Sequence, residues 1–120
     1  ARQTRPDYQE VKVQIEDKQS MIKANVWNEL SKNGIKEHTL RVANDTLMQD
    51  ILAALTLNNL DSLMWEIEWV GTMLAHQDLS QKLLGEYLYA YAEALDRHAG
   101  KAADVVSNRL RATAIQHEGR

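Results

Sequence analysis

Aromatic residues and histidines recur at helical spacing in the second half of the sequence. Trp65 and Trp69 lie four residues apart, and Met73 and His76 continue the same line. Side chains three, four or seven residues apart share one face of a helix. A second line further along the chain consists of Tyr87, Tyr91 and His98. If the two helices are antiparallel neighbours, these lines form one groove, with the expected lining residues Trp65, Trp69, Met73, Tyr87, Tyr91 and His98.

Three interpretations of this aromatic groove follow from the chemistry of its side chains. The groove is hydrophobic core, a protein interface, or a pocket for a flat apolar cofactor. As an interface it would bind a partner protein or a second copy of the chain, because the polar groups of Trp and Tyr suit binding surfaces. As a pocket it would hold a tetrapyrrole, haem or cobalamin, with His98 or His76 as the axial ligand. The sequence leaves all three open.

Residues that could support catalysis or metal binding lack the necessary spacing. None of the four histidines follows a Glu by three residues, and no two are three to five residues apart, which argues against carboxylate-bridged iron and zinc sites. The absence of cysteine excludes thiolate ligands. There is no Gly-x-Ser-x-Gly turn and no glycine-rich phosphate loop. Glu66 and Glu68 are the closest carboxylate pair, but they project roughly 200° apart on a helix. We therefore expect neither an enzyme nor a metal site.

Apolar residues at spacings of three and four predict helices almost throughout the chain. A long N-terminal helix of about 25 residues should end at Asn33-Gly34, where Asn or Gly readily adopts the left-handed conformation. Val11–Ile15 also alternates as a strand would, but its flanks lack turn residues. Further helices are expected over residues 36–55, 59–75, 80–100 and 102–112. The predicted fold is all-α, a four-helix-bundle-like single domain of about five helices over residues 1–120, with residues 1–6 and 114–120 frayed.

Composition and charge narrow the classes of partner. The chain has a net charge of −3 and an isoelectric point near 5.8, so nucleic-acid binding by this chain alone is disfavoured, because such proteins present a basic face. No apolar run approaches the ~18 residues that a membrane-spanning helix needs. No signal peptide is visible, which predicts a soluble cytoplasmic protein without a membrane partner.

The middle of the chain is similar to one kind of helical domain. The similarity covers Asp50–Leu55, Asn59–Asp61, Trp65–Leu74 and Asp78-Leu79. This pattern of apolar residues and turns resembles the helical cap that precedes cobalamin-binding domains in light- and cobalamin-responsive regulators. In those regulators the cap covers the upper face of the corrin. The 120 residues contain neither the α/β domain nor the Asp-x-His-x-x-Gly motif that supplies the lower axial ligand, so cobalamin binding would need another chain or a further segment.

The sequence thus predicts a helical sensory or regulatory module that acts by binding. The aromatic-rich helical face should bind a partner protein or a second copy, giving a homodimer or a heteromeric complex. The alternative is a tetrapyrrole-binding sensor domain that uses the Trp, Tyr and His side chains of the groove. In the first case no cofactor is expected.

Overall fold

The computed structural model describes residues 8–33, 36–76 and 81–118, and these residues form helices and turns without a strand. The prediction of an all-α fold is therefore confirmed for this part of the chain. The segment Val11–Ile15 is helical, with Val11 and Ile15 buried and Val13 exposed. Two short 3₁₀ segments are η1 (Ser31–Asn33) and η2 (Gly100–Ala103). The α-helices are α1 (Tyr8–Leu30), α2 (Glu37–Thr56), α3 (Ser62–His76), α4 (Gln81–Ala99) and α5 (Asp104–Glu118).

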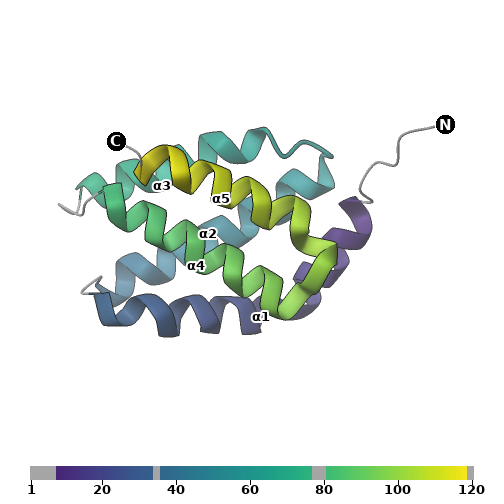
Figure 1. Cartoon of the computed structure of the whole chain (residues 1–120), viewed down its shortest axis with the longest axis horizontal. Helices are drawn as coiled ribbons and strands as arrows, with labels where there is room; N and C mark the ends of the chain where they lie inside the picture. Colours follow the sequence, from purple (N-terminus) through teal and green to yellow (C-terminus); the bar gives the residue numbers. More distant parts are fainter. Residues whose placement is uncertain (1–7, 34–35, 77–80, 119–120) are drawn as a thin grey trace.

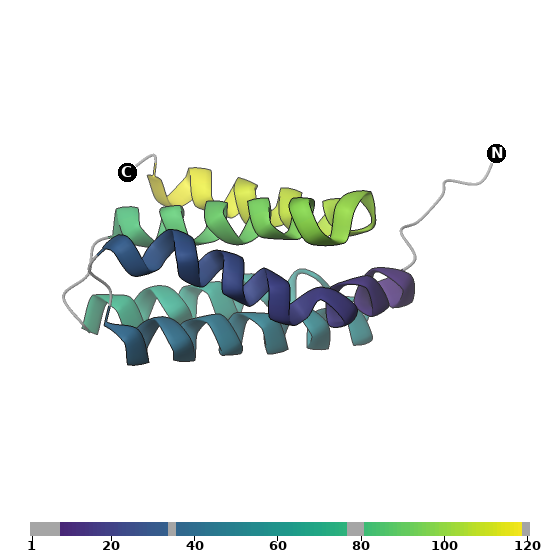
Figure 2. The same cartoon turned by 90° about the horizontal axis from the view of Figure 1, so that it is seen from below.

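The helices lie side by side in two layers, with α1 along one edge (Figures 1 and 2). One layer consists of α4 and α5 and the other of α2 and α3, and α1 contacts both α2 and α4. The buried stripe of α1 explains this position, because its members repeat at helical spacing and face both layers. They are Val11, Ile15, Ile22, Val26 and Leu30.

The polar interruption in the α1 stripe lies between Ile15 and Ile22. Both isoleucines are fully buried, whereas Lys18 and Gln19, which the sequence places on the same face, are half-buried. Long polar side chains can cover apolar surface with their methylene groups while their polar ends reach water. The helix therefore continues through this point without a break.

The turn between α2 and α3 sets the direction in which α3 leaves the core. Asn58 has a left-handed backbone with φ of 55°, a conformation that Asn adopts more readily than most residues. The Asn59 side-chain oxygen accepts a hydrogen bond from the Asp61 amide at 3.1 Å, and the Ser62 hydroxyl donates to the Asn59 carbonyl at 2.9 Å. Helix α3 begins at Ser62, three residues later than predicted.

The last helix differs from the prediction at its carboxyl end. Residues 114–120 were expected to fray, but α5 continues to Glu118, and Thr113 and Ala114 are buried. The start of α5 is held to α4 by Asp96, which accepts a hydrogen bond from Ser107 at 2.8 Å and pairs with Arg111. Although burial raises the pKa of Asp96, the hydrogen bonds from Arg111 and Ser107 bring it below its usual value. Residues 1–6, also expected to fray, lie outside the described residues.

The sequence predicts that no helix of this chain spans a membrane, and the length and polarity of the helices test this. Across the described residues, no helix combines the length and the apolar character that crossing a bilayer requires.

Candidate functional site

The most exposed aromatic residues of the chain lie in one line on α3. Trp65 is 74% exposed and Trp69 is 49% exposed. Thr72 and His76 are also exposed and follow at helical spacing, so the four side chains share one face of the helix. We name this line the tryptophan ridge. It consists of Trp65, Trp69, Thr72 and His76.

The tryptophan ridge points directly away from the core. Leu63 and Ile67 are fully buried, and each precedes a ridge tryptophan by two residues. Since an α-helix has 3.6 residues per turn, two residues correspond to a rotation of roughly 200°. Each indole therefore projects from the side of α3 opposite to the buried leucine and isoleucine. The exposure follows from the register of α3 and requires no local distortion.

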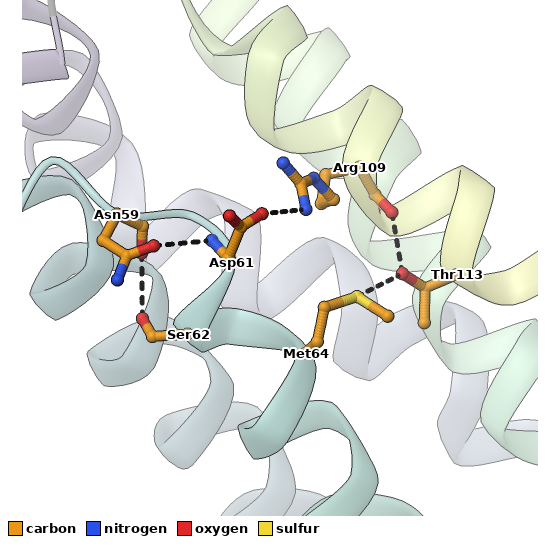
Figure 3. Close-up of polar contacts among 6 residues, drawn as sticks. All are labelled: Asn59, Asp61, Ser62, Met64, Arg109 and Thr113. Atoms are coloured by element: carbon orange, nitrogen blue, oxygen red, sulfur yellow. Dashed lines mark hydrogen bonds and ion pairs between the residues drawn. The ribbon is translucent and has the colours of Figure 1, made fainter.

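One flank of α3 is fixed by α5 (Figure 3). The Arg109 guanidinium pairs with Asp61 at 2.8 Å, and the Thr113 hydroxyl lies 3.2 Å from the sulfur of Met64. The same hydroxyl lies 3.0 Å from the Arg109 carbonyl oxygen. Asp61 is largely exposed, so its ion pair contributes little to stability. These contacts join the start of α3 to α5.

The other flank of α3 faces α2 through two carboxyl groups. Burial, and after it the charge of Glu66 and a hydrogen bond to Glu66, together raise the pKa of Asp50 to about 6. One Asp50 carboxyl oxygen is buried. Two ionised carboxylates that face each other repel, whereas one shared proton allows a hydrogen bond between them. The junction between α2 and α3 therefore depends on pH near 6.

The tyrosines predicted for the groove belong instead to the core. Tyr87 and Tyr91 are buried, and their rings meet edge to face at 5.8 Å between centroids. The Tyr87 hydroxyl donates to the Ala43 carbonyl of α2 at 2.9 Å, whereas the buried Tyr91 hydroxyl has no hydrogen-bond partner among the described residues. Burial raises the pKa of both hydroxyls well above the usual value. Both side chains therefore remain neutral at physiological pH.

His98 lies at a third place, against α1. Its Nε2 atom is 3.2 Å from the Asn25 side-chain oxygen, which also accepts a hydrogen bond from Arg97 at 2.9 Å. The histidine is half-buried and held by this contact. His76, the other predicted axial ligand, is exposed on the tryptophan ridge. Only His76 therefore shares a face with Trp65 and Trp69.

The structure thus separates the residues that were expected to line one groove. Trp65 and Trp69 lie on the surface, Tyr87 and Tyr91 in the core, and His98 at the junction of α1 and α4. Buried tyrosines cannot line a surface groove, so for this pair the core interpretation applies and the interface and pocket interpretations do not. The side chain of Met73 lies outside the described part of the structure.

One aromatic site, between α1 and α2, was not predicted from the sequence. The Arg41 guanidinium lies 5.9 Å from the centre of the Trp27 ring, a cation–π distance, and also pairs with Glu37 at 2.9 Å. Trp27 is half-buried between α1 and α2. The pairing joins two different helices, so spacing along the chain gives no signal for it. No group of three or more His, Asp or Glu within the described residues is placed to hold a metal ion.

The chain was compared with known proteins by sequence and by structure. No family model, no curated protein and no solved structure matches it. The assignment of function therefore rests on the tryptophan ridge.

Proposed function

We propose that this protein is a regulatory or sensory binding module whose tryptophan ridge docks onto another protein surface. The observation that supports this is the exposure of Trp65 and Trp69 on the side of α3 opposite to the core. Tryptophan is enriched among the residues that dominate binding energy at interfaces. A fully covered aromatic side chain buries about 150–250 Å², of which these tryptophans still expose half or more, and burying apolar surface contributes roughly 25 cal/mol per Å². Two indoles one turn apart can therefore anchor an interface.

The scaffold of this module is, in our proposal, a four-helix-bundle-like domain with a long N-terminal helix, working in the cytoplasm. Support comes from the two layers of helices and from α1, which spans 23 residues along their edge. The burial of Leu63 and Ile67 anchors α3 in the core and supports a preformed binding face, which loses less entropy on binding.

The test compares exposed residues on two helices. The variants are Trp65→Ala and Trp69→Ala on the ridge, and Ile115→Ala as a matched exposed apolar residue on α5. Self-association is measured by sedimentation velocity, and partner binding with proteins that are captured by the wild-type chain and then purified. We expect at least about tenfold weaker association for the ridge variants, with helix content unchanged, and no effect of Ile115→Ala. Equal association for all four proteins would contradict the proposal.

A second candidate function is binding of a tetrapyrrole on the same face. The observation in its favour is that His76 is exposed in line with Trp65 and Trp69, so a flat ring could stack on an indole while the imidazole binds its metal. Absorbance spectra after addition of haem or cobalamin test this. We expect a saturable shift that His76→Ala abolishes and His98→Ala leaves intact, because His98 is engaged by Asn25. A spectrum without any shift would eliminate this candidate.

A further inference from the structure

Helix α3 carries only acidic charges beside the tryptophan ridge, and the nearby Arg109 of α5 is paired with Asp61. Helix α3 contains Glu66 and Glu68 and no Lys or Arg. Because each residue advances the helix by roughly 100°, the two carboxylates lie on opposite sides of the ridge. Glu68 is exposed, and none of the described cations forms an ion pair with it. Glu66 faces Asp50, which adds a further acidic group on that side.

This charge disfavours a second copy of the chain as the occupant. A twofold interface brings the same patch of both copies together, so the carboxylates of one α3 would face those of the other without a cation from either helix. The net charge of −3 per chain adds to the repulsion. Anionic membranes and nucleic acids are disfavoured for the same reason.

A cationic partner is complementary both to the indoles and to the carboxylates of this surface. Indole faces attract Lys and Arg side chains through cation–π contacts, with Trp the strongest of the aromatic residues. The flanking carboxylates supply complementary charge, which sets the choice of partner and the rate of association. Inside the chain itself, Arg41 already lies over the Trp27 ring and pairs with Glu37. That contact combines the same three groups that the ridge and a basic side chain would bring together.

We propose that the occupant of the tryptophan ridge is a cationic amphipathic helix of another protein. Its apolar side chains cover Trp65 and Trp69, and its Lys or Arg side chains pair with Glu66 and Glu68. The distance along α3 from Trp65 to His76 is roughly 16 Å at 1.5 Å per residue, so about three turns of the partner helix cover the ridge. This inference rests on the proposed function and specifies the chemistry of the partner.

The experiment uses two designed peptides of equal length, each about 18 residues or roughly 27 Å of helix. Both carry leucine at helical spacing, and the remaining positions are Lys in one peptide and Glu in the other. Isothermal titration calorimetry measures their binding to the full chain at low and at high salt. We expect the Lys peptide to bind at least about tenfold more tightly than the Glu peptide, with the preference falling as salt rises.

The variants test which residues carry the preference. We expect Glu68→Lys and Trp69→Ala each to weaken binding of the Lys peptide by about tenfold. Glu93→Lys on α4 makes the same charge change at another exposed site and should leave binding unchanged. Glu68 and Trp69 are exposed, and far-UV circular dichroism checks that their variants fold.

The other outcomes overturn the inference in different ways. If both peptides bind equally and Trp69→Ala weakens both, the proposed function survives and the cationic partner is wrong. If neither peptide binds and Trp69→Ala abolishes self-association, the occupant is a second copy. Ridge-dependent binding to vesicles of phosphatidylcholine and phosphatidylglycerol would make it a membrane surface. If Trp65→Ala and Trp69→Ala change nothing, the proposed function fails together with this inference.

Discussion

Helices α3 and α4 carry the same aromatic pattern with opposite consequences. Each has two large aromatic residues one turn apart, Trp65 and Trp69 on α3 and Tyr87 and Tyr91 on α4. The tyrosines are buried and the tryptophans are exposed. This difference in exposure arises from the helices that surround each pair. Helix α4 contacts α1, α3 and α5, so only a narrow stripe of it is exposed, whereas α3 lies at the edge of its layer.

Aromatic spacing in the sequence therefore predicts which residues share a face of a helix, but it does not predict whether that face contacts another helix or solvent. On α4 the face meets other helices, and its aromatic residues stabilise the fold. On α3 it meets solvent, and its aromatic residues are available for binding. Variants of the α4 tyrosines should therefore change the stability of the fold, and variants of the α3 tryptophans should change binding.

The largest expected difference is between removal of one aromatic ring from each helix. Tyr91→Ala should lower the free energy of unfolding by about 3–5 kcal/mol, because it leaves a cavity in the core. Trp65→Ala should change it by less than about 0.5 kcal/mol, as is usual for surface positions. Urea unfolding followed by far-UV circular dichroism measures both. Similar losses for the two variants would contradict the contrast between the helices.

A smaller effect distinguishes the two buried tyrosines from each other. Tyr87→Phe removes a hydroxyl that donates to the Ala43 carbonyl and should lower the unfolding free energy by about 1 kcal/mol. Tyr91→Phe removes a buried hydroxyl that has no partner within the described part of the chain and should raise it by up to about 1 kcal/mol. The same unfolding assay gives both values. A loss for Tyr91→Phe equal to that for Tyr87→Phe would show that its hydroxyl is hydrogen-bonded.

The smallest expected effect concerns the carboxyl pair beside the ridge. Because the pKa of Asp50 rises from its usual 3.8 to about 6 on folding, the folded state binds its proton more tightly than the unfolded state. Protonation of Asp50 therefore adds stability that is fully present below 3.8 and is lost as the pH rises through 6. Asp50→Asn should stabilise the protein by about 1 kcal/mol at pH 7, since solvent screens this half-exposed pair, and by nothing near pH 4.

The control for this pH dependence is Glu93→Gln, which removes an exposed carboxylate on α4. It changes the net charge by the same one unit at a site away from the pair, so the comparison of the two variants separates the effect of Asp50 from that of net charge. If Asp50→Asn gives the same stability difference at both pH values, then Asp50 does not titrate in this range.

Sequence reasoning predicted the all-α fold because apolar periodicity reports directly on which face of each helix is buried. Leu63 and Ile67 on α3 and Leu84 and Leu88 on α4 repeat at helical spacing, and all four are buried. The carboxyl end of α5 was mispredicted because Thr113 and Ala114 carry little apolar signal, although other helices cover them.

The candidate site was harder to predict because it depends on contacts between distant segments. The spacing of Trp65, Trp69 and His76 correctly placed them on one face, but nothing local indicates that no helix covers that face. His98 contacts Asn25, which lies 73 positions earlier in the chain. Pairs of this kind are set by the packing of whole helices, which periodicity within one helix does not encode.

The distribution of the three indoles determines what the intrinsic fluorescence of this protein reports. Trp65 is largely exposed, Trp69 is half-exposed, and Trp27 is half-buried beneath a guanidinium. Unfolding should therefore shift the emission maximum less than it would for buried indoles, although it removes nearly all helix. An occupant of the ridge would take Trp65 and Trp69 out of water and shift the emission to shorter wavelength. For this protein, tryptophan emission is a gauge of occupancy rather than of folding.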